Sequence, residues 1–126
     1  MDKRRLRVLP GIYAIAKESC KPPLREPENS VLAVISDGKS YTWIGPRDYL
    51  PASSRVQSGF RLLEVEGPLD LELTGVIAGI SAVLAEARVP IFALSSYDTD
   101  YILVPGRKLS AAVAALKTGG YTVLTT

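Results

Sequence analysis

The sequence predicts an α+β protein in which strands and helices alternate through the second half of the 126-residue chain. Segments 74–88 and 107–118 carry apolar residues at helical spacing, so each presents one apolar face. Segment 92–104 has two runs of apolar, aromatic and β-branched residues on either side of the polar Asp98-Thr99-Asp100, which predicts a strand hairpin with a tight corner. Residues 1–59 contain strand-like runs without a helical pattern.

The elements of the second half follow one order along the chain. Thr74 is a plausible N-cap for the first helix, Pro90 follows its end, and Gly119 suits the C′ position of the second helix. The order is strand 60–66, helix 74–88, strands 92–97 and 101–104, helix 107–118 and strand 121–125. This βαββαβ order predicts a split βαβ fold of the ferredoxin-like type.

The first half is predicted to be a shortened, mostly β unit. Its strand candidates are 6–9, 11–17, 31–36 and 40–44, and the Pro-rich segment 18–30 is predicted to be a loop. Asp37-Gly38 lies between two of these runs and favours a type I′ hairpin turn. We therefore expect two domains, 1–59 and 60–126, and a core formed by Leu63, Val65, Ile77, Ile80, Leu84, Leu94, Leu103, Val113 and Leu116.

The composition excludes several kinds of active site. The chain has no His, so a His-dependent catalytic triad is excluded, together with the commonest general base. Its single cysteine, Cys20, cannot form an internal disulfide and leaves little for a transition-metal site. We expect no catalytic residue, no metal and no cofactor.

The charge is distributed unevenly between the two halves. Residues 1–59 carry ten Lys and Arg against six Asp and Glu, a balance of +4, whereas residues 60–126 carry five against seven, a balance of −2. Lys3, Arg4, Arg5 and Arg7 could form a nucleic-acid arm, but no basic patch with interleaved aromatic residues follows, and a solvated tail is favoured. With no apolar run long enough to span a bilayer and no signal-peptide pattern, the prediction is a cytoplasmic protein that binds neither nucleic acid nor membrane.

Two segments resemble ACT domains, those of small bacterial ACT-domain proteins, aspartate kinases and the CASTOR arginine sensors most of all. They are 63–70 (Leu-Glu-Val-Glu-Gly-Pro-Leu-Asp) and 93–104 (Ala-Leu-Ser-Ser-Tyr-Asp-Thr-Asp-Tyr-Ile-Leu-Val). The resemblance covers residues 60–126 and implies that 1–59 is a shortened ACT-like companion. It further implies a non-catalytic regulatory protein that senses an amino acid or a related metabolite at a domain or subunit interface.

A binding site is expected at one end of the predicted sheet. There the ends of strands 60–66 and 90–97 meet the start of helix 74–88, whose free N–H groups suit a carboxylate. Gly67 and Gly75 allow close approach to the backbone, and Asp98 or Asp100 could accept an ammonium group. The expected ligand-binding residues are Gly67, Pro68, Leu69, Asp70, Leu73, Thr74, Gly75, Ser95, Asp98 and Asp100.

Two alternatives stay open at the sequence level. Asp98 and Asp100 are also ordinary solvent-facing turn residues, and the chain could be a module without ligand that only mediates assembly.

Strand 101–104 carries apolar residues on both faces, while helices can cover only one face in this topology. The other face is therefore expected to be covered by residues 1–59, by a second subunit or by both, and a homodimer is favoured.

Overall fold

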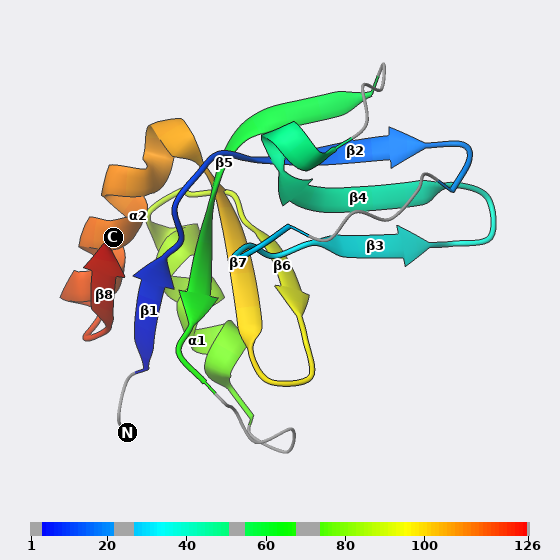
Figure 1. The fold of residues 1–126 in the computed structure, drawn as a ribbon. Helices are drawn as coiled ribbons and strands as arrows, with labels where there is room; N and C mark the ends of the chain where they lie inside the picture. The colour runs from blue at the N-terminus through cyan, green and yellow to red at the C-terminus, as the bar shows by residue number, and fades with distance from the viewer. Residues whose placement is uncertain (1–3, 22–26, 51–54, 68–73, 126) are drawn as a thin grey trace. The chain divides into compact units, whose positions relative to one another are not determined.

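The computed structural model describes residues 4–21, 27–50, 55–67 and 74–125. The chain groups into two units (Figure 1). The first, here called the helical unit, comprises Met1–Pro10 and Arg61–Thr126, and the second, here called the β-rich unit, comprises Gly11–Phe60.

The helical unit has the predicted βαββαβ order. It contains the C-terminal part of β5 (Val56–Val65), α1 (Val76–Glu86), β6 (Phe92–Ser95), β7 (Asp100–Pro105), α2 (Leu109–Thr118) and β8 (Thr122–Thr125). The first turn of the second predicted helix is a 3-10 helix, η2 (Gly106–Lys108). The predicted hairpin is confirmed, because β6 and β7 pair antiparallel with Leu94 opposite Tyr101.

A strand from the N-terminus completes the sheet of this unit. β1 (Arg5–Val8) pairs antiparallel with β5 on one side and parallel with β8 on the other. The strand order is therefore β6-β7-β5-β1-β8, with β7 between β5 and β6 as in a split βαβ unit. The sequence indicated an apolar run at 6–9 but gave no partner for it.

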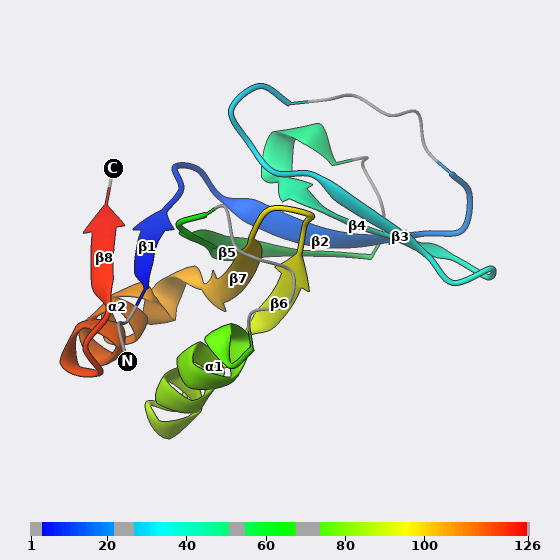
Figure 2. The ribbon, with the colours of Figure 1, turned by 90° about the horizontal axis from the view of Figure 1, so that it is seen from below.

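Both helices lie on one face of this sheet (Figure 2). Alternation along each strand turns every second side chain toward them. Six of the nine predicted core residues are buried: Leu63, Val65, Ile80, Leu84, Leu103 and Leu116. Ile77 and Val113 are partly buried and pack against the cluster beneath the helices, whereas Leu94 is partly buried because it lies on an edge strand and points to the opposite face. The buried cluster beneath the helices comprises Leu6, Val8, Leu63, Val65, Ile80, Leu84, Val89, Ile102, Val104, Ala112, Leu116, Tyr121 and Val123.

The central strands also bury apolar groups on their second face. Leu62 and Leu103 alternate with the helix-facing residues of β5 and β7, and both are buried. The prediction of apolar groups on both faces of this sheet is thus confirmed. Coverage of the second face by a partner subunit stays a prediction.

The β-rich unit contains β2 (Tyr13–Glu18), β3 (Ala33–Ser36), β4 (Tyr41–Pro46), the short η1 (Arg47–Tyr49) and the beginning of β5. Its strands are ordered β3-β4-β2-β5, and all neighbours are antiparallel. Ala14, Ala16, Trp43 and Leu50 form its own buried cluster. Its described residues include no α-helix, as expected for a shortened half.

No helix in the described part of the chain is long and apolar enough to cross a membrane. The division into domains 1–59 and 60–126 stays a prediction, with β1 now placed in the helical unit.

Candidate functional site

The corner between β6 and β7 is closed by the Ser96 side chain and backbone. The Ser96 hydroxyl accepts hydrogen bonds from the backbone N–H of Asp98 (3.3 Å) and of Thr99 (3.2 Å). The Ser96 backbone N–H donates to the Thr99 carbonyl at 2.8 Å. A serine that bonds to the backbone two and three residues further on is typical of a tight turn. Four residues are therefore held in one conformation by local bonds.

Thr99 joins this corner to the end of β5. It is buried, and its hydroxyl donates a hydrogen bond to the carbonyl of Val65, the last residue of that strand. A buried hydroxyl with a partner avoids the cost of an unsatisfied polar group. The bond fixes the corner beside Glu66 and Gly67, as the topology predicted for these two ends.

Ser95 and Asp100 lie on the face of the sheet that the helices cover. They are directly opposite each other in the β6–β7 pairing, and Asp100 precedes the helix-facing Ile102 by two residues. The Ser95 hydroxyl donates to the Asp100 carboxylate at 2.5 Å. The pair forms one polar group at the end of the sheet where α1 begins (Figure 1).

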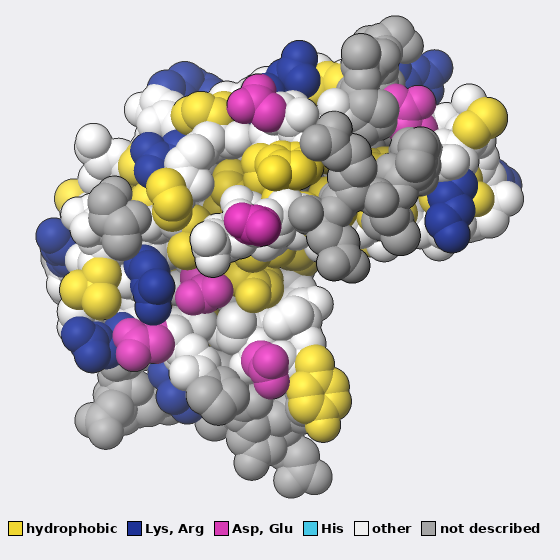
Figure 3. All heavy atoms as spheres, in the orientation of Figure 1, with side chains coloured by type: hydrophobic (Ala, Val, Ile, Leu, Met, Phe, Trp, Pro, Cys, Tyr) yellow, Lys and Arg dark blue, Asp and Glu magenta, His cyan; other side chains and the backbone are white. Residues whose placement is uncertain are grey.

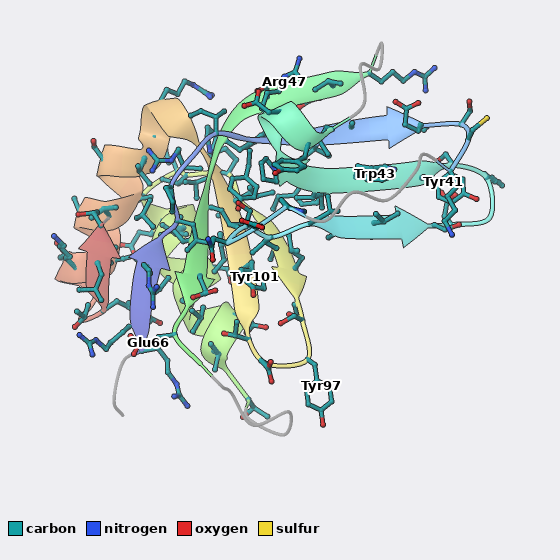
Figure 4. All side chains as sticks on the ribbon, in the orientation of Figure 1. Tyr41, Trp43, Arg47, Glu66, Tyr97 and Tyr101 are labelled. Atoms are coloured by element: carbon teal, nitrogen blue, oxygen red, sulfur yellow. The ribbon has the colours of Figure 1, made fainter. Side chains whose placement is uncertain are left out.

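Asp98 and Tyr97 are exposed at the tip of the corner. Tyr97 is 80% exposed and points away from the strands (Figure 4), and Figure 3 shows an uncovered hydrophobic side chain at this tip. Among the described residues, no hydrogen bond or ion pair to the Asp98 carboxylate is found. The two predicted aspartates therefore have different surroundings: Asp100 is hydrogen-bonded to Ser95, and Asp98 faces solvent.

The start of α1 departs from the prediction at Thr74. The N-cap is Gly75, which adopts a left-handed conformation with φ of 83°, and no side chain of the described residues forms a capping hydrogen bond. The exposed Thr74 precedes it. The first turn contains no acidic residue either. Because the first N–H groups of a helix have no partner within it, this terminus retains donors suited to an anion.

The structure locates six of the ten predicted site residues at this end of the helical unit. Gly67 follows β5, Thr74 and Gly75 precede α1, and Ser95, Asp98 and Asp100 belong to the corner. Pro68, Leu69, Asp70 and Leu73 lie outside the described residues. The sequence interpretation missed the bonds of Ser96 and Thr99, although their Ser-x-x-Thr spacing across a turn was a usable signal.

The arginines of β1 lie next to glutamates at the end of β5 and just after it. Arg5 forms an ion pair with Glu66, with 3.5 Å between Nε and Oε2, and the Glu66 backbone N–H donates to the Arg5 carbonyl at 2.8 Å. Arg7 is opposite Glu64 in the register. The basic N-terminal segment predicted as a solvated tail is thus in part a strand. Opposite charges across neighbouring strands favour this pairing by up to about 1 kcal/mol.

No group of three or more His, Cys, Asp or Glu side chains in the described part of the chain is arranged to hold a metal ion. Cys20 is a free, exposed thiol.

The model of the family described as ACT domain matches residues 55–118, which is about half of the chain. The match includes β5, α1, β6, β7 and α2.

Solved structures of similar fold cover nearly the whole chain. A protein of Agrobacterium tumefaciens superposes with a TM-score of 0.87 at 22% identity, covering 100% of this chain and 96% of that one. The regulatory subunit of aspartate kinase from Thermus flavus gives a TM-score of 0.63 at 9% identity, covering 94% and 99% of the two chains. A Vibrio cholerae protein of unknown function gives 0.67 at 17% identity, covering 94% and 91%. At these identities the likeness establishes the fold.

Proposed function

Since the chain belongs to the ACT domain family, we propose that it is a non-catalytic regulatory module that binds an amino acid or a related small acid. The site is the corner end of the helical unit, between the 67–75 segment and Asp98-Thr99-Asp100. The proposal includes action in the cytoplasm as a homodimer, without nucleic acid, membrane or cofactor.

The position of the corner beside the start of α1 carries this assignment. The Thr99–Val65 bond holds the corner against the end of β5, and the Ser95–Asp100 pair lies on the helix-covered face at the end where α1 begins. No side chain of the described residues caps α1 there. Donors for a carboxylate and acceptors for an ammonium group are thus both present at one end of one unit. These are the two groups that every free amino acid carries.

The two aspartates would act differently. Asp98 is free to turn toward an ammonium group without breaking a bond that it already makes. Asp100 would bind through the oxygen that Ser95 leaves open, since an ionised carboxylate accepts several hydrogen bonds. Ser95 would then orient Asp100 rather than touch the ligand.

Fluorimetric melting with the common amino acids identifies the ligand first, because a compound that binds only the folded chain raises the unfolding midpoint. Calorimetry with that ligand then compares the parent with Asp98→Ala and Asp100→Ala. Loss of the engaged carboxylate should weaken binding by about 1.5–3 kcal/mol, the usual contribution of a hydrogen bond to a charged group.

Asp48→Ala is the matched control, because Asp48 is an exposed aspartate in η1 of the β-rich unit. It should leave affinity unchanged. If both corner variants bind as tightly as the parent, the corner is only a turn and the proposed site is wrong.

A second function is favoured by the local bonding of the corner. Ser95, Ser96 and Thr99 all make hydrogen bonds within the protein, as they would in a purely structural turn. The chain would then be an assembly module without ligand. No amino acid would raise the unfolding midpoint in that case, whereas self-association would persist.

A further inference from the structure

β3 forms one edge of the β-rich sheet, and β4 is its one strand partner among the described residues (Figure 1). The backbone N–H of Asp37 donates to the Ser40 carbonyl at 3.3 Å. This bond identifies Asp37 and Ser40 as a hydrogen-bonded pair of the β3–β4 ladder. Because bonded and non-bonded pairs alternate in an antiparallel ladder, Ala33 and Ile35 bond to β4. The N–H and C=O groups of Val34 and Ser36 therefore point outward from the edge.

The side chains of this edge carry no charge. β3 has the sequence Ala-Val-Ile-Ser, and Val34 and Ile35 are 37% and 52% exposed. They point to opposite faces of the sheet, so both faces of the edge are apolar. Exposed edge strands are ordinarily protected by a Lys, a Pro, a bulge or a very short length. The four residues of β3 contain no Lys, Pro or bulge, so that its short length is the one such protection within the strand.

We propose that two copies of this chain associate through β3, pairing the strands antiparallel about a two-fold axis at Ile35. This inference names the surface of the homodimer in the proposed function and rests on that homodimer. Ile35 then lies opposite Ile35 of the second copy, and Val34 lies opposite its Ser36. The outward backbone groups of Val34 and Ser36 bond across the axis in both directions.

A second copy fits this edge better than an unrelated segment does. Pairing identical strands about a two-fold axis closes the assembly at two chains. In this register Asp37 lies opposite an alanine, Ala33, so that no like charges meet. The pairing also buries the most exposed apolar side chain of the strand against its own equivalent.

The length of β3 sets the strength of the association. Four residues a side give much less than the roughly 1,000 Å² expected of a stable interface. The dimer should therefore depend on concentration and form weakly. Its affinity should depend little on salt, since no ion pair contributes.

The test uses opposite charges at Ile35 in the full-length chain. Ile35→Lys and Ile35→Glu should each be monomeric in sedimentation velocity at concentrations where the parent dimerises, because like charges then meet at the axis. An equimolar mixture of the two variants should dimerise again, because Lys and Glu are then directly opposite. Ile12→Lys is the matched control, since Ile12 is 48% exposed in the same unit outside β3, and it should dimerise like the parent.

Each outcome has one meaning. Monomeric single variants with a dimeric mixture support the pairing at Ile35. If the single variants still dimerise, or if their mixture stays monomeric, the β3 proposal is wrong while the homodimer of the parent stands. If the parent stays monomeric at every concentration, both the interface and the homodimer are wrong, and ligand binding is judged separately by calorimetry.

Discussion

Tyr121 places its hydroxyl group against α1 of the helical unit. The residue is buried, and burial raises the pKa of its phenol above the ordinary value of 10.0. Gly79 of α1 leaves room for this hydroxyl: a Cβ atom at position 79 would lie 2.7 Å from Tyr121 Oη. The glycine inside α1 is therefore explained by a packing contact with a residue more than forty positions away, and not by a turn.

Gly79→Ala should destabilise the protein by up to about 2 kcal/mol. Alanine favours a helix interior by roughly 1 kcal/mol over glycine, but overpacking a buried site costs about 1–3 kcal/mol. Urea unfolding measures the balance. In Tyr121→Phe the clashing oxygen is gone, so the same Gly79→Ala change should become neutral or stabilising. Equal effects in both backgrounds would contradict this explanation.

At the scale of elements, the β3–β4 hairpin is set by Asp37. Its carboxylate accepts hydrogen bonds from the backbone N–H of Lys39 (2.9 Å) and of Ser40 (2.8 Å). Gly38 has a positive φ of 85°, whereas Asp37 and Lys39 are not among the residues with positive φ. The predicted type I′ turn, which needs positive φ at both central residues, is therefore wrong. The central residues are Gly38 and Lys39, as in a type II′ turn.

The hairpin should loosen as the solution is acidified. Hydrogen bonds from Ser40 and then Lys39 lower the pKa of Asp37 below 3.8. A carboxyl group with a lowered pKa in the folded chain contributes stability above its unfolded pKa, near 3.9, and loses it as the pH falls through the folded value. A carboxyl chemical-shift titration should give a midpoint below 3.8, with faster amide exchange of Lys39 and Ser40 on the acid side.

Asp37→Asn is the control for this titration. The amide oxygen still accepts the two backbone bonds but has no proton to gain, so the acid-dependent exchange should disappear while the hairpin remains. A midpoint at or above the ordinary aspartate value in the parent would show that the two bonds are not made in solution.

At the scale of the whole molecule, β1 shows that the helical unit needs residues from the N-terminus to complete its sheet and core. Leu6 and Val8 are 1% and 2% exposed, in the cluster beneath the helices, although they lie more than fifty residues before the rest of that cluster. Without β1, β5 would lose one of its neighbours, and β8 would lose the one strand that it pairs with among the described residues. The region that matches the family model, 55–118, therefore lacks part of the core that stabilises it.

Deleting residues 1–10 should cost at least about 3–4 kcal/mol, from two buried aliphatic side chains at roughly 2 kcal/mol each. That is a large fraction of an ordinary domain's stability. Deleting only residues 1–4 leaves β1 intact and is the control. A synthetic peptide of residues 1–10 should raise the melting midpoint of the shortened chain. Equal midpoints for the full-length and the 11–126 chains would mean that β1 is dispensable.

The sequence by itself determined the elements of the helical unit and the direction of its strands. Periodicity sets which side chains of α1 and α2 face the sheet, and the βαββαβ order then places the corner, the end of β5 and the start of α1 at one end. These are local consequences of side-chain spacing and chain connectivity. Most of the core, and the position of the candidate site, followed from them.

Tertiary structure decided the rest. Insertion of β1 between β5 and β8, the contact of Tyr121 with Gly79 and the bond from Thr99 to Val65 each join residues far apart in sequence. No local pattern encodes such pairs, because each is selected by the packing of the completed fold. The surroundings of Asp98 and Asp100 differ for the same reason, since the β6–β7 register brings Ser95 opposite Asp100, where it can donate a hydrogen bond.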